Sequence, residues 1–77
     1  MNKLEVRQSV MSGTPINCSD EEMPLVRMWL HEIAAQSIDE GQAIYAQIAL
    51  MEVKKIDDRT RDAELRVQTE SGSGQND

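Results

Sequence analysis

The residues best suited to chemistry in this chain are its single cysteine and its single histidine, Cys18 and His31. A cysteine nucleophile needs an adjacent base, and nothing in the spacing brings the imidazole to the thiol. A structural zinc site needs about four Cys or His ligands, which is more than the chain supplies. We therefore expect an unreactive thiol, a solvated histidine, no metal site and no cofactor. The other interpretation of His31 is a pH-sensitive contact at an interface.

Carboxylates occur in pairs, and paired acids can catalyse hydrolysis or bind a metal ion. The pairs are Glu21–Glu22, Asp39–Glu40 and Asp57–Asp58. The first two stand where helices are expected to start, and acidic residues there complement the positive end of the helix dipole. The third lies on a strongly charged stretch that is expected to be solvated. These patterns favour structural roles, so we predict that the protein is not an enzyme.

Length and charge narrow the remaining classes of function. The chain has 77 residues, with 14 acidic and 8 basic side chains and a net charge of −6. This balance opposes the phosphate neutralisation that dominates nucleic-acid binding, so a nucleic-acid partner is not expected. No segment approaches the roughly 20 apolar residues of a membrane span, and the first residues lack the apolar run of a signal peptide. One unpaired cysteine suits a reducing compartment, so we predict a cytoplasmic protein. The lack of a long apolar segment predicts that it does not contact a membrane.

A chain of this length builds a limited apolar core, which disulfides, metals or oligomerisation usually supplement. A single cysteine excludes a disulfide within the chain. Self-association or partner binding is therefore the expected source of additional stability. The sequence divides into three parts, which are an N-terminal arm at 1–19, a helical hairpin at 20–67 and a disordered tail at 68–77.

The N-terminal arm is predicted to be irregular. Leu4 and Val6 suggest an alternating strand, but the alternation fails at Gln8, and Gly13 interrupts any regular element. The alternative is a strand over residues 3–10, which would need a partner strand from elsewhere because an isolated strand is unstable.

The first helix of the hairpin is expected to begin near Ser19 or Asp20. The "SDEE" sequence matches a capping box, with Ser19 at the cap and Glu22 three residues later. Pro24 favours a start one or two residues further on, because proline is tolerated in the first helical turn. An apolar arc of about 180° then follows at helical spacing. It consists of Leu25, Val26, Trp29, Leu30, Ile33 and Ala34.

A turn is predicted at "SIDEGQ", residues 37–42. Ser37 with Glu40, or Asp39 with Gln42, would form a second capping box, and Gly41 is a weak helix former. A second helix should begin near residue 39 or 40. The alternative is one uninterrupted helix through the whole region.

The second helix contains "AIYAQIALM", in which Gln47 is the one polar residue. Ile44, Ile48 and Met51 fall within about 60° of one another on a helical wheel, and other apolar residues adjoin them. A helix that is apolar nearly all round is normally buried nearly all round, and one hairpin partner cannot cover it. We therefore predict an all-α homodimer, a four-helix assembly of two hairpins. The predicted interface residues are Trp29, Ile33, Ile44, Tyr45, Ile48 and Met51.

The expected function is that of a small, acidic, non-enzymatic interaction or regulatory protein. Chains of this type, including those of phages and plasmids, often occupy a partner protein as adaptors, inhibitors or chaperones. The sequence does not distinguish a second copy from a foreign protein as the cover of the apolar surface.

One alternative follows from the order "KLEVRQS", "LHEIAAQS" and "QAIYAQIALMEV". This order of strand, helix and helix resembles that of ribbon–helix–helix proteins. The resemblance implies a dimeric DNA-binding regulator or antitoxin whose paired N-terminal strands enter the major groove. The chain departs from that pattern in the long connection "VMSGTPINCS" and in having only Lys3 and Arg7 as basic residues of the strand.

Overall fold

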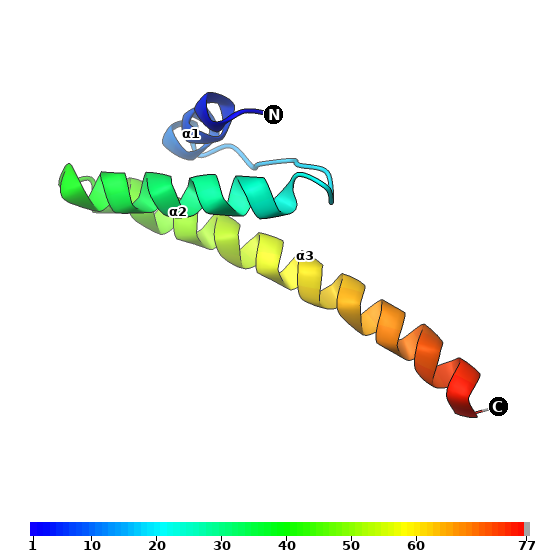
Figure 1. Cartoon of the computed structure of the whole chain (residues 1–77). Helices are drawn as coiled ribbons and strands as arrows, with labels where there is room; N and C mark the ends of the chain where they lie inside the picture. The colour runs from blue at the N-terminus through cyan, green and yellow to red at the C-terminus, as the bar shows by residue number, and fades with distance from the viewer. Residues whose placement is uncertain (77) are drawn as a thin grey trace.

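The computed structural model is all-helical over the part of the chain that it describes (Figure 1). Helix α1 comprises Lys3–Ser12, α2 comprises Met23–Asp39 and α3 comprises Ala43–Asn76. Side chains are described for residues 1–66. The all-α class predicted from the sequence is confirmed. The backbone of α3 continues as a helix through residues 68–76, where a disordered tail was predicted. The side chains of that segment lie outside the described residues, and its disorder stays a prediction.

Helices α2 and α3 pack against each other as an antiparallel pair joined by a tight turn (Figure 1). Gly41 ends the first helix in the left-handed conformation, with φ of 74°. Its N–H donates to the carbonyl of Ile38 at 3.0 Å, and the N–H of Gln42 donates to the carbonyl of Ser37 at 2.7 Å. These two bonds form a Schellman cap. The position of the turn is confirmed, and the alternative of one uninterrupted helix is wrong. The second helix begins at Ala43 rather than near residue 39 or 40, because the Schellman cap extends the turn to Gln42.

The start of α2 lies later than the sequence pattern indicated, at Met23 rather than Ser19 or Asp20. The capping box does form, because the N–H of Glu22 donates to the Ser19 hydroxyl at 3.3 Å and the N–H of Ser19 donates to Glu22 at 3.1 Å. It closes a turn that leads into α2. The later start places Pro24 in the first helical turn, where its missing N–H removes no helical hydrogen bond.

The segment predicted to be irregular, or alternatively a strand, is helix α1, and this part of the prediction is wrong. The Asn2 side chain caps the helix by accepting the N–H of Glu5 at 2.9 Å. Gly13, with φ of 72°, ends it in a second left-handed cap. Val6 and Val10 lie one turn apart on the same face and are both fully buried. Burial of this pair against the hairpin stabilises a helix where weak alternation had suggested a strand.

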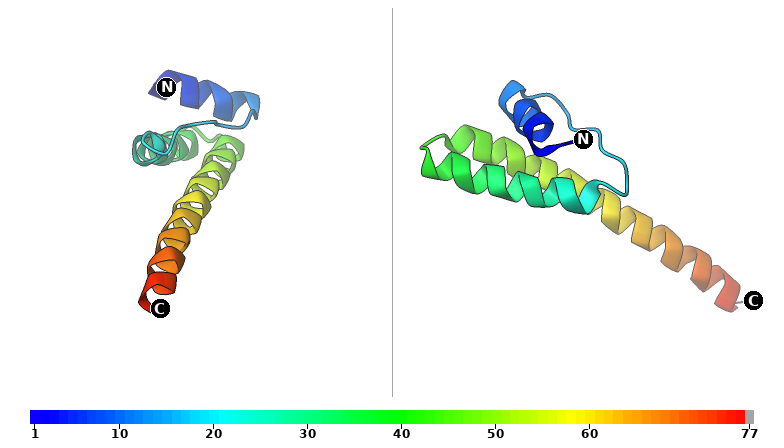
Figure 2. Two further views of the ribbon diagram at one scale, coloured as in Figure 1. Left: turned by 90° about the vertical axis from the view of Figure 1, so that its right-hand side faces the viewer. Right: turned by 45° about the horizontal axis from the view of Figure 1, so that its top comes forward.

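Helix α1 lies across one side of the hairpin, and the connection from α1 to α2 runs along the same side (Figure 2). The core therefore combines all three helices and that connection. Its buried members are Val6, Val10, Cys18, Met23, Val26, Leu30, Ile33, Ala34, Ala46, Ala49, Val53 and Ile56. No described element covers the side of the hairpin away from α1 (Figure 1).

Candidate functional site

The apolar run that opens α3 is covered on one side only. Ala46 and Ala49 face the core and are almost completely buried, and their small side chains allow close helix packing. Ile44 and Met51 are each 61% exposed, and Ile48 is half-buried at the edge of the core. These last three residues, one group on the helical wheel, are called the α3 stripe below. The stripe is the part of the predicted interface that a single chain leaves open.

The other three predicted interface residues lie closer to the core. Ile33 is 3% exposed and belongs to the core of a single chain. Trp29 and Tyr45 are half-buried and pack against that core. A helical wheel identifies apolar faces, but it cannot show which face the third helix will occupy. The structure thus separates Ile33 from the stripe, and the interface itself remains a prediction.

The hairpin exposes further large apolar side chains outside the stripe. They are Leu25, Met28, Ile38, Leu50 and Leu65, each between 44% and 61% exposed. Leu25 had been placed in the apolar arc of the first helix, yet it is 45% exposed, because α1 and α3 leave that edge of α2 open. The apolar surface of the hairpin is therefore larger than one chain covers.

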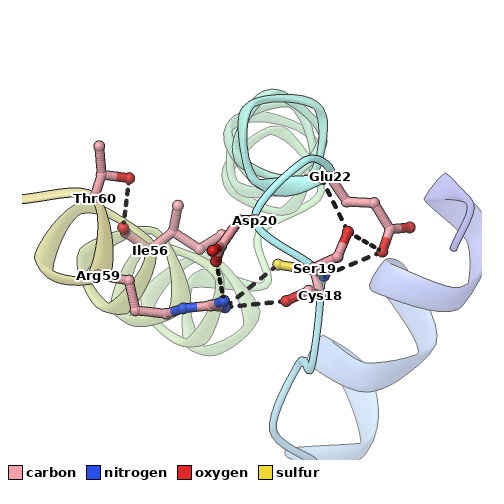
Figure 3. Close-up of polar contacts among 7 residues, drawn as sticks. All are labelled: Cys18, Ser19, Asp20, Glu22, Ile56, Arg59 and Thr60. Carbon is pink, nitrogen blue, oxygen red and sulfur yellow. Dashed lines mark hydrogen bonds and ion pairs between the residues drawn. The ribbon is translucent and has the colours of Figure 1, made fainter. Parts of the chain in front are cut away.

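Arg59 of α3 fastens the connection between α1 and α2 to the hairpin (Figure 3). Its Nη1 donates to the Cys18 carbonyl at 3.2 Å, and its Nη2 donates to the Asp20 carboxylate at 2.9 Å. Cys18 is 8% exposed, and its thiol, at 3.8 Å from Nη1, has a guanidinium beside it rather than a base. Sequence reasoning missed this role of Arg59, because no local pattern links positions so far apart.

Glu22 joins the start of α1 to the start of α2. The α-ammonium of Met1 donates to Glu22 Oε2 at 2.9 Å, and the Ser19 hydroxyl donates to Oε1 at 3.0 Å. The hydrogen bond from the ammonium, followed by those from the Ser19 N–H and hydroxyl, lowers the pKa of Glu22 from 4.5 to about 2. The same contact raises the pKa of the Met1 amino group. The Glu22 carboxylate thus holds the start of α1 next to the start of α2.

An ion pair between Arg27 and Asp57 links α2 to α3, with Arg27 Nε donating to Asp57 at 2.7 Å. The hydrogen bond from Arg27 lowers the pKa of Asp57, and the charges of Arg27, His31 and Arg61 add to the effect. His31 is exposed on α2, as the sequence predicted. The two neighbouring acids therefore have different partners: Asp57 pairs with Arg27, and Asp58 pairs with Arg61.

Within the described residues, no three Cys, His, Asp or Glu side chains gather closely enough to hold a metal ion. None of the described helices has the length and apolar character needed to cross a membrane. No protein-family model, curated protein or solved structure matches the chain.

Proposed function

We propose that this chain is a non-enzymatic interaction protein that acts as a homodimer of helical hairpins and presents an acidic helical surface to a protein partner. Adaptor, inhibitor and chaperone roles all fit this description. The unpaired thiol of Cys18 suits a reducing compartment, so the proposal places the dimer in the cytoplasm.

The observation that supports the proposal is the exposure of the α3 stripe. Ile44 and Met51 each leave 61% of their surface open on a helix whose opposite face is buried. Isolated exposed apolar residues need no explanation, but a stripe at helical spacing is typical of a surface that binds another helix. Covering it removes apolar area from water, which is the main favourable term in protein association.

Charge supports a protein partner over a nucleic acid. Five basic side chains already pair with carboxylates of the same chain, namely Lys3, Arg27, Lys55, Arg59 and Arg61. The acidic excess of the chain suits a basic protein surface, where it would mainly accelerate encounter. The ribbon–helix–helix alternative is not retained, because the segment that would supply its strand is helix α1.

The first test measures mass and helicity in the wild-type protein and in Ile44→Asp. The wild type should scatter light with about twice the chain mass of 8.7 kDa at micromolar concentration. Ile44→Asp should remain helical and become monomeric, since a charge in the buried interface would be unpaired. The control is Ile38→Asp, which has the same 61% exposure but lies outside the stripe, and it should remain a dimer. A folded wild-type monomer would refute the dimeric part.

The second test addresses the partner. Affinity capture is carried out with the wild type and, for comparison, with Ile44→Asp and Ile38→Asp. The wild type should recover a partner protein whose binding becomes weaker at high salt but is not abolished. A DNA titration at low salt serves as the counter-test. Saturable, sequence-specific DNA binding with no protein partner recovered would contradict the proposal.

A further inference from the structure

The α3 stripe has two features that decide how a second copy can bind it. Ile44, Ile48 and Met51 follow one another at spacings of four and three residues, which is the spacing of a seam between two packed helices. The next position of that series is Lys55, which is charged, so the apolar part of the seam is short. A short seam must be completed by its flanking residues.

The flanking residues have opposite charges at the two ends. The turn before α3 contributes Asp39 and Glu40, both exposed, at the C-terminal end of α2, where the helix dipole is also negative. The other end contributes Lys54 and Lys55, also exposed. Lys55 pairs with Glu52 at 3.2 Å but leaves 62% of its side chain open.

Neither acid pairs with a cation within the described residues, and Lys54 has no carboxylate partner there. Glu40 accepts a hydrogen bond from the Gln36 amide at 3.1 Å, which leaves its charge uncompensated. The stripe is therefore an apolar segment with a negative end and a positive end, both available to a second molecule.

We propose that the α3 stripe binds a second copy of this chain in an antiparallel arrangement, with Lys54 and Lys55 of each copy beside Asp39 and Glu40 of the other. This inference rests on the dimer of the proposed function and specifies its geometry and its charge contacts. It assigns a role to two lysines and two acids that the fold of a single chain does not use together.

The register follows from the spacing along the helix. Lys55 lies about 10 Å from Ile48 along the helix axis in one direction, and Ala43, the first residue of α3, lies about 8 Å away in the other, at roughly 1.5 Å per residue. Asp39 and Glu40 precede the turn at that end of α3. A two-fold axis passing near Ile48 therefore brings each lysine pair to the acidic pair of the other copy. A parallel arrangement would place lysine beside lysine and acid beside acid, which is unfavourable. The antiparallel contact is isologous, so it closes as a dimer.

The experiment uses the wild-type protein as an equal mixture of ¹⁴N-labelled and ¹⁵N-labelled chains. A carbodiimide joins an ammonium and a carboxylate that are in direct contact, and mass spectrometry shows whether a cross-linked peptide pair mixes the two isotopes. We expect mixed-isotope links from Lys54 or Lys55 to Asp39 or Glu40. A dimer whose mixed links join these lysines elsewhere, or that lacks such links, would overturn the proposed geometry but not the dimer. A monomer at every concentration would overturn both.

Charge variants provide an independent measurement. The double variant Lys54→Glu, Lys55→Glu should raise the dimer dissociation constant by about tenfold or more at low salt. The two new glutamates of each copy would then face Asp39 and Glu40 of the other. Adding Asp39→Lys and Glu40→Lys to that variant should restore the wild-type constant. The matched control is Arg61→Glu with Arg66→Glu, which changes the charge equally beyond the stripe and should have a smaller effect. Equal weakening by the two double variants, or no restoration, would overturn the geometry.

Discussion

At the scale of single residues, long polar side chains hold the elements of this small chain in position. Arg59 reaches from α3 to both Cys18 and Asp20, and the carboxylate of Glu22 binds the Met1 ammonium. Each contact joins segments that lie close in space but are distant in sequence. Exposed ion pairs of this kind each contribute modestly to global stability, and they also keep the segments that they join locally ordered.

Arg59→Lys should therefore loosen the connection without unfolding the hairpin. Lysine keeps the charge but cannot hold the Cys18 carbonyl and the Asp20 carboxylate together with one planar group. Local opening should become more frequent, so the buried Cys18 thiol should react several-fold faster with a disulfide reagent. The control is Arg61→Lys, whose Asp58 contact lies within α3. Equal reaction rates in wild type and Arg59→Lys would contradict the role of Arg59.

The low pKa of Glu22 predicts that its contacts with Met1 and Ser19 are lost in acid. Its pKa in the folded chain, about 2, is below the ordinary value of 4.5, so its contacts stabilise the fold above about pH 4.5. That contribution should be lost as the pH falls from 4.5 towards 2. Glu22→Gln should lower the melting temperature at pH 7. It should also reduce the difference between the melting temperatures at pH 7 and pH 2, both measured by circular dichroism. Glu21→Gln, at an exposed neighbour, should behave as wild type; an unchanged pH dependence in Glu22→Gln would argue against these contacts.

At the scale of elements, the sequence predicted those helices whose ends and faces have strong local signals. The turn before α3 was identified from Gly41, and the solvated position of His31 was correct. Helix α1 was missed because its two apolar residues, Val6 and Val10, are a weak periodic signal in a polar segment. Asn2 and Gly13 stand at the two ends of α1 as caps and, taken with that pair, would have indicated a helix.

The left-handed cap at Gly41 yields a prediction at the level of the hairpin. A Cβ atom added there would meet nothing within 4 Å, so a substitution would be limited by the positive φ alone. Gly41→Ala should reduce the free energy of unfolding by about 1–2 kcal/mol, measured by urea denaturation. Gly41→Asn should be milder, because asparagine tolerates this conformation better. Equal losses in the two variants would show that something other than backbone conformation limits this position.

At the scale of the whole molecule, the candidate surface was only partly predictable. The faces of α3 are evident from residue spacing, and Ile44 and Met51 are indeed left open by the single chain. The position of α1 was not evident, because it depends on packing between distant segments. That packing decides which apolar face is core and which is surface, and it places Ile33 inside the chain.

A dimer that completes the core predicts that stability depends on protein concentration. Dimerisation couples folding to association, so the melting temperature should rise as the concentration rises. A tenfold increase corresponds to about 1.4 kcal/mol, which for two chains of this size amounts to a rise of about 3–5 °C. Ile44→Asp, which removes the interface, should melt at one temperature at all concentrations. A wild-type melting temperature that is independent of concentration would show that each hairpin is stable alone and that the α3 stripe serves a different partner.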